Sequence, residues 1–153
     1  MTAERRIRDA TEADAEAVLR IVESAYAIYV PRLGRRPPPM DWDYAERIRQ
    51  GRVLVAEDEA EEIVGALAVV PEPEQLLIES LVVAPARQGE GVGRALIAHA
   101  EASARAEGLR RLWLFTHVKM VENQAIYRHL GFEECGREGS GGMVRVLFEK
   151  PLS

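Results

Sequence analysis

The sequence predicts an α/β (α+β) fold: a mixed, mostly antiparallel sheet of about six to seven strands with about four helices on its faces. Three consecutive apolar segments, residues 52–58, 62–70 and 75–83, have the composition of strands and are joined by short acidic or proline-containing turns. Such turns suit antiparallel neighbours. Helical and strand patterns then alternate over residues 91–150, which adds helices to the faces of the same sheet.

The first third of the chain is expected to supply one strand and two helices. Residues 6–9 form a short strand candidate, and a Thr11–Asp14 capping box then opens an amphipathic helix predicted over residues 11–30. The proline-rich segment 31–40 is predicted to be a loop, because it can continue neither as a helix nor as a central strand. A second helix is predicted from Asp41 to a glycine stop at Gly51.

The second half of the chain continues the alternation. A glycine-rich stretch, residues 87–96, opens a helix that should run to Glu107 and stop at Gly108. Next come a strand over residues 111–117, a short helix over residues 123–130 capped by Gly131, and closing strands over residues 132–138 and 144–150. The chain has no internal repeat, so residues 1–153 are expected to form a single domain.

Composition limits the classes of partner. The net charge of −5 argues against a general nucleic-acid binder, which usually has a basic face, but it is compatible with a small basic pocket. The only cysteine, Cys135, cannot form an intrachain disulfide, which fits a reducing compartment. The apolar runs fall far short of the roughly 20 residues that span a bilayer, and the first residues lack a signal-peptide core. We therefore expect a cytoplasmic protein with no membrane partner, and no cluster of side chains has metal-ligand spacing.

The stretch RQGEGVGRAL, residues 87–96, follows a strand and opens a helix, an arrangement that binds anions. Free N–H groups at a helix start and the helix dipole both favour negative charge there. The dinucleotide fingerprint requires G-x-G-x-x-G, and the phosphate loop of nucleotide hydrolases requires a Lys-Ser or Lys-Thr pair, so both fit poorly. A tight helix entrance without a ligand is the structural alternative.

A third pattern fits better. The sequence QGEGVG matches [R/Q]-x-x-G-x-[G/A], with Gln88, Gly91 and Gly93 at the defining positions. Further along, NQAIYRHLGFEECG places Asn123 and Tyr127 four positions apart on a short helix before Gly-Phe. These two motifs, in this order, resemble those of the GNAT superfamily of N-acetyltransferases, and the resemblance covers essentially the whole chain.

The resemblance implies acetyl-coenzyme A (acetyl-CoA) as cosubstrate, held at its pyrophosphate by loop amides and at its pantetheine arm by the end of the preceding strand. The implied coenzyme-binding residues are Leu81, Val82, Val83, Gln88, Gly89, Glu90, Gly91, Gly93, Arg94, Asn123 and Tyr127. Glu90 departs from the family, in which Arg, Lys or Gln is common at this place. An acid beside a pyrophosphate should cost affinity, which Arg87 and Arg94 could offset.

Two side chains are candidates for the chemistry. In the family a tyrosine at the place of Tyr127 reaches the thiol sulfur, so Tyr127 is the candidate general acid; the alternative is a ring that packs in the core. Glu79 is the only ionisable side chain of its strand, which makes it the candidate general base. Strand alternation would put Glu79 on the same face as Leu81 and Val83. The alternatives are a solvent-facing carboxylate, or one that holds an arginine of the first helices.

The acceptor is expected to be a primary amine of a small molecule, attacked directly in a ternary complex. Aromatic and arginine side chains concentrate in residues 26–44, and Tyr26, Tyr29 and Arg35 are the predicted substrate contacts. Helix packing beside a solvated basic loop explains the same residues equally well. A protein or peptide acceptor, a non-catalytic acyl-CoA-binding sensor and a partner-binding domain remain alternatives, and the resemblance also implies a possible homodimer.

Overall fold

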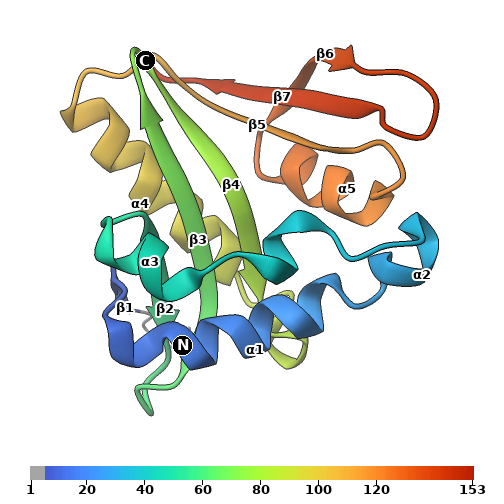
Figure 1. The fold of residues 1–153 in the computed structure, drawn as a ribbon. Helices are drawn as coiled ribbons and strands as arrows, with labels where there is room; N and C mark the ends of the chain where they lie inside the picture. Colours follow the sequence, from blue (N-terminus) through green and yellow to red (C-terminus); the bar gives the residue numbers. More distant parts are fainter. Residues whose placement is uncertain (1–5) are drawn as a thin grey trace. The chain divides into compact units, whose positions relative to one another are not determined.

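The computed structural model describes residues 6–153, which contain a seven-stranded sheet in the order β1-β2-β3-β4-β5-β7-β6 (Figure 1). The strands are β1 (Arg6–Asp9), β2 (Val53–Glu57), β3 (Ile63–Glu72), β4 (Gln75–Val83), β5 (Arg111–His117), β6 (Glu133–Glu138) and β7 (Arg145–Pro151). The helices are α1 (Ala15–Tyr26), α2 (Tyr29–Leu33), α3 (Tyr44–Arg49), α4 (Val92–Ala106) and α5 (Val121–His129), with 3₁₀ helices η1 (Glu12–Asp14), η2 (Pro38–Asp41) and η3 (Pro85–Arg87).

The pairing of the strands confirms the predicted mixed, mostly antiparallel sheet. The β1–β2, β2–β3, β5–β7 and β6–β7 pairs are antiparallel, whereas β4 and β5 run parallel. The chain forms two compact units: the first comprises the residues up to 69 together with 80–99, and the second comprises residues 70–79 and 100–153. The expectation of a single domain over residues 1–153 stays a prediction.

In the first unit, alternate residues of the strands face helices on opposite sides. Val18 and Val22 of α1 lie over one face, against side chains that include Ala66 of β3 and Val82 of β4. On the other face, α4 approaches β3 so closely that a Cβ added at Gly65 would lie 2.7 Å from a methyl carbon of Val92. The sheet of this unit is therefore covered on both faces, as expected from its continuous apolar strands.

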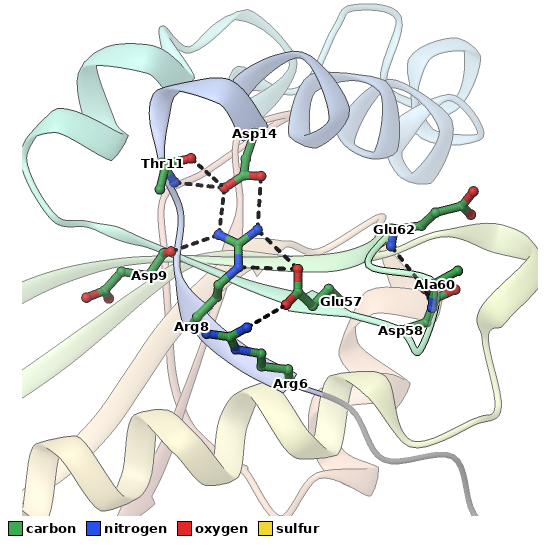
Figure 2. A network of polar contacts seen from close by, with 9 residues as sticks. All are labelled: Arg6, Arg8, Asp9, Thr11, Asp14, Glu57, Asp58, Ala60 and Glu62. Atoms are coloured by element: carbon green, nitrogen blue, oxygen red, sulfur yellow. Dashed lines mark hydrogen bonds and ion pairs between the residues drawn. The ribbon is translucent and has the colours of Figure 1, made fainter.

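A network of charged side chains joins the beginning of the chain to β2 (Figure 2). The guanidinium of Arg8 on β1 donates to both carboxylate oxygens of Asp14, at 2.8 and 3.1 Å, and to Glu57 of β2 at 3.2 and 3.3 Å. Asp14 also accepts the backbone N–H of Thr11 at 2.8 Å, which confirms the predicted capping box. Asp14 and Glu57 are only 8% and 5% exposed, so β1, the start of α1 and β2 are fixed together by a mostly buried arginine fork.

The helix predicted over residues 11–30 is interrupted. It ends as α1 at Tyr26, and the short helix α2 then begins at Tyr29, although the backbone of Ala27 and Ile28 keeps right-handed helical angles. The prediction of no helix within residues 31–40 is also wrong, because α2 includes Pro31. This proline is the third residue of α2, in the first turn, where the N–H groups have no intrahelical acceptor to lose.

The next helix begins later than predicted. It starts at Tyr44 rather than Asp41, because the side chain of Asp43 accepts the N–H of Glu46 at 3.0 Å and caps the helix there. The predicted stop at Gly51 is confirmed. Residues 38–41 form the 3₁₀ helix η2, which packs against α1.

The second unit follows the predicted order closely. Strand β5 has the predicted bounds, and α5 begins two residues earlier than predicted. Leu112, Leu114, Val146 and Phe148 form the buried face of β5 and β7. Over this face lies α5, whose Tyr127 ring packs against Phe148. Within residues 6–153, no helix combines the length and the apolar character that crossing a bilayer would require.

The Arg8 network predicts a pH-dependent contribution to stability. Asp14→Asn keeps the size of the side chain, removes its charge and should lower the free energy of unfolding at pH 7 by about 1–3 kcal/mol. Hydrogen bonds from Arg8 hold the pKa of Asp14 below its usual value of 3.8. The stabilisation is therefore complete above the pKa that Asp14 has in the unfolded chain, and it is lost as the pH falls through the lower pKa of the folded state. The difference in the free energy of unfolding between the wild type and Asp14→Asn should accordingly shrink below a pH of about 4.

Urea denaturation across this pH range measures the effect. Glu12→Gln is the matched control, because Glu12 is an exposed carboxylate 3.6 Å from Arg49. It should change the free energy of unfolding by less than about 0.5 kcal/mol. A loss for Asp14→Asn no larger than that of the control would contradict the importance of the network.

Candidate active site

The glycine loop, defined here as residues 88–91, connects η3 to α4 and is exposed along its whole length. Gly89 and Gly91 have φ values of +84° and +83°, a left-handed backbone that other residues rarely adopt. At Gly93, in contrast, an added Cβ would lie 3.6 Å from Leu81 and 3.9 Å from Val83, which is ordinary contact. Two of the three glycines are therefore needed for the turn itself, and the third leaves room for a small residue.

The start of α4 is fixed against the sheet. Gly65 of β3 lets Val92, the first residue of α4, approach the strand, and Leu96 lies one turn further along the same contact. The first intrahelical bond runs from the N–H of Ala95 to the carbonyl of Gly91 at 3.0 Å. The preceding amides of a helix have no intrahelical acceptor and carry the positive end of the helix dipole. The arrangement therefore suits an anionic ligand.

Glu90, the residue that departs from the family pattern, is paired inside the loop. Its carboxylate accepts a hydrogen bond from Nε of Arg87 at 3.0 Å, and another nitrogen of Arg87 donates to Asp58 at 2.8 Å. Arg87 therefore makes an ion pair with Glu90 at 3.0 Å. The negative charge that seemed misplaced in the sequence is partly compensated by a neighbour three residues away.

The end of β4 is buried on both faces. Ser80, Leu81 and Val82 are 3%, 8% and 3% exposed, and the hydroxyl of Ser80 lies 2.9 Å from that of Tyr26. Burial raises the pKa of Tyr26 to about 12, so its phenol stays protonated. Only backbone groups of residues 81–83 are available for hydrogen bonding with a ligand, because their side chains are aliphatic.

The predicted acceptor contacts have different surroundings. Tyr26 and Tyr29 are buried, at 5% and 4% exposed, with ring centroids 6.2 Å apart. The guanidinium of Arg32 lies 5.4 Å from the Tyr29 ring. Arg35 is exposed. Of the three predicted contacts, only Arg35 is thus exposed, and the acceptor roles of all three stay predictions.

In the second unit, Asn123 is held by a buried threonine. Its Nδ2 donates to Oγ1 of Thr116 at 3.2 Å, and the hydroxyl of Thr116 lies 3.8 Å from the sulfur of Met120. On the same helix Gln124 donates to the carbonyl of Val118 at 2.9 Å. These bonds fix both the start of α5 and the side-chain direction of Asn123.

Tyr127 and Glu79, the candidate acid and base, both belong to the second unit. The ring of Tyr127 is 3% exposed and packs edge-on to Phe132 at 5.7 Å and tilted to Phe148 at 6.5 Å. Glu79 is half-buried, with its Oε1 atom shielded from solvent. On β4 it continues the row of Gln75, which pairs with Arg111 of β5. The catalytic roles of Tyr127 and Glu79, and the predicted face of Glu79, stay predictions.

Four residues that support the candidate site were not predicted: Asp58, Ser80, Thr116 and Gln124. Each acts through a partner that the sequence does not identify. Ser80, for example, contacts Tyr26, which lies 54 positions earlier in the chain. A polar residue within an apolar strand, as at Ser80 and Thr116, is the one signal that could have pointed to them. Within residues 6–153, no group of three or more His, Cys, Asp or Glu side chains could hold a metal ion.

Comparison with known proteins identifies a family for this chain. The model of the acetyltransferase (GNAT) family matches residues 17–132. N-alpha-acetyltransferase 80 of Mus musculus is 45% identical over 65 residues, which are 42% of this chain and 19% of that protein. Streptothricin acetyltransferase of Streptomyces lavendulae is 42% identical over 69 residues, which are 44% of this chain and 35% of that protein. The matches thus span well under half the length of these two relatives.

A solved structure agrees in fold. The PaiA N-acetyltransferase from Thermoplasma acidophilum, in complex with coenzyme A, superposes with a TM-score of 0.75 and 16% identity, covering 97% of this chain and 99% of that one. At this identity the likeness concerns the fold alone. The family match, in contrast, includes the glycine loop, α4 and most of the sheet. The chain belongs to the acetyltransferase (GNAT) family.

Proposed function

We propose that this chain transfers an acetyl group from acetyl-CoA to a primary amine of a small molecule. The observation that carries the proposal is the glycine loop, in which Gln88, Gly91 and Gly93 stand at the defining positions of the family motif. The loop leads directly into the 15-residue helix α4. The left-handed backbone at Gly89 and Gly91 forms the turn that leads into the start of this helix.

The loop fits the anionic part of a coenzyme. Its exposed residues and the first amides of α4 offer N–H donors at the positive end of a helix dipole. In this proposal the amides of residues 88–93 hold the pyrophosphate, with Arg94 adding charge, and the backbone of residues 81–83 holds the pantetheine arm. Asn123, which donates one Nδ2 hydrogen to Thr116, offers its carbonyl oxygen as a hydrogen-bond acceptor for the coenzyme.

Acetyl-CoA, when bound, supplies a thioester carbonyl and a thiol leaving group. The amine must be neutral to attack, although a lysine-type amine has a pKa of about 10.4. We propose that the carboxylate of Glu79 takes the proton that the amine loses as the new C–N bond forms. The phenol of Tyr127 gives its proton to the sulfur as the C–S bond breaks, because a thiol leaves more easily than a thiolate.

Two observations bear on the acceptor. The relative named for streptothricin supports a small molecule, and the exposed Arg35 would suit an acceptor that carries a carboxylate or phosphate. The relative named as an N-alpha-acetyltransferase makes a peptide N-terminus the second candidate. The exposed free thiol of Cys135 supports a reducing location such as the cytoplasm, and a homodimer stays a prediction.

The proposal is tested first by binding and then by turnover. Acetyl-CoA should raise the melting temperature, because a ligand that binds only the folded state stabilises it. Thiol release should then be measured with a panel of streptothricin, amino sugars, polyamines, amino acids and a peptide with a free N-terminus. We expect release with at least one small amine and little with the peptide. Binding without release would favour a sensor, release only with the peptide would favour the second candidate, and no binding would overturn the proposal.

Tyr127→Phe removes the hydroxyl and keeps the aromatic ring. The packing against Phe132 and Phe148 should survive, whereas loss of the proton donor should lower kcat by at least about 10²-fold. The dissociation constant for acetyl-CoA, measured by calorimetry, should change by less than about twofold.

Tyr44→Phe is the matched control for Tyr127→Phe. The hydroxyl of Tyr44 donates to the carbonyl of Pro39 at 2.6 Å, and its loss should cost about 1 kcal/mol of stability without changing kcat. Equal kcat values for Tyr127→Phe and the wild type, with the best amine found, would remove Tyr127 from the chemistry.

Thr116→Val tests how Asn123 is positioned. The substitution keeps the shape of the side chain and removes the oxygen that accepts the Asn123 N–H bond. We expect the KM for acetyl-CoA to rise about three- to tenfold, with kcat at saturation within about twofold, since one hydrogen bond is at stake. Thr116→Ser restores the oxygen and should restore the KM. A loss of kcat at unchanged KM, or equal defects in Val and Ser, would contradict this role.

A further inference from the structure

We infer that Arg87 and Asp58 are positioning residues, which hold the glycine loop in its binding conformation before the coenzyme arrives. Asp58 lies in the turn between β2 and β3, 29 positions before Arg87, and reaches the loop through its hydrogen bond with that arginine. The inference rests on the proposed function, because it assigns the ion pair a purpose in coenzyme binding.

The carboxylate of Asp58 is itself fixed. One oxygen accepts the backbone N–H groups of Ala60 and Glu62 at 2.9 and 3.0 Å, and the other accepts from Arg87 at 2.8 Å (Figure 2 shows the turn). The N–H of Asp58 also donates to the carbonyl of Glu62 at 3.0 Å. The side chain is only 13% exposed. Asp58 therefore offers a rigid carboxylate that belongs to the sheet and not to the loop.

The glycine loop is more exposed than the Asp58 side chain. Residues 88–91 are all exposed, and an added Cβ at Gly89 would meet no heavy atom within 4 Å. The bond from the N–H of Gln88 to the carbonyl of Pro85 is long, at 3.5 Å. Glycines lose more conformational freedom on ordering than other residues, so a coenzyme that had to order this loop would bind more weakly. Arg87, next to the loop and tied to Asp58, reduces that cost.

A comparison of Asp58 with Glu90 tests the inference. For Asp58→Asn, the loss of negative charge alone predicts tighter coenzyme binding, whereas the loss of a positioning contact predicts weaker binding. Arg87 binds Asp58 and Glu90 alike, at 2.8 and 3.0 Å, so Asp58→Asn and Glu90→Gln each remove one negative charge from the same arginine. By charge alone, both variants should bind an anionic coenzyme more tightly. Only Asp58→Asn, however, releases Arg87 from the sheet.

The experiment measures coenzyme binding by calorimetry in the full chain. We expect Asp58→Asn to weaken acetyl-CoA binding about two- to fivefold, because one partly exposed ion pair contributes an energy of this size. The KM for acetyl-CoA should rise with little change in kcat. Glu90→Gln should bind more tightly than the wild type. Glu46→Gln is the control, because it removes an exposed ion pair with Arg49 on α3 and should leave binding unchanged.

Amide hydrogen exchange in the ligand-free protein supplies a second readout that needs no coenzyme. Residues 86–91 should exchange about two- to fivefold faster in Asp58→Asn than in the wild type, and no faster in Glu90→Gln. Unchanged exchange in Asp58→Asn, or binding as tight as that of the wild type, overturns the inference. Failure of the wild type to bind acetyl-CoA overturns the proposed function instead, and the exchange rates still decide whether Asp58 orders the loop.

Discussion

The contact between the first turn of α4 and strand β3 determines where the glycine loop can lie. A Cβ added at Gly65 would come within 2.7 Å of Val92 and 3.1 Å of the carbonyl oxygen of Val82, so even alanine would push the helix away from the strand. Because α4 begins at Val92, this contact fixes the end of the loop within the first unit. The glycine loop therefore ends on a helix that is packed against the sheet.

In the described part of the first unit, four arginines each pair with two carboxylates. They are Arg8 with Asp14 and Glu57, Arg36 with Glu23 and Asp41, Arg49 with Glu12 and Glu46, and Arg87 with Asp58 and Glu90. A planar guanidinium can satisfy two carboxylates at once, which suits a protein with a net charge of −5. Glu57 and Asp58 are neighbours at the end of β2, and Figure 2 shows both. One strand end therefore anchors β1 through Arg8 and the glycine loop through Arg87.

Features that depend on adjacent residues could be predicted from the sequence. The capping box at Thr11, the helix ends at Gly51 and Gly108, and the bounds of β5 are confirmed, because each depends on residues close in the chain. The interruption after Tyr26 could not be predicted, since neither Ala27 nor Ile28 is a helix breaker. Within the candidate site, the glycine loop was predictable as a motif. The Arg87–Asp58 ion pair was not, because nothing in the sequence indicates that the β2–β3 turn reaches the loop.

The surroundings of Tyr127 reconcile two interpretations that are alternatives in the sequence alone. Its ring is part of the hydrophobic core beside Phe132 and Phe148, which is the structural role. Such packing restricts the ring to few rotamers, and a proton donor that acts at a fixed atom needs this restriction. A buried tyrosine can therefore serve the fold through its ring and the chemistry through its hydroxyl. On α5, the bond from Nδ2 of Asn123 to Thr116 likewise fixes the direction of a side chain that the proposal assigns to the coenzyme.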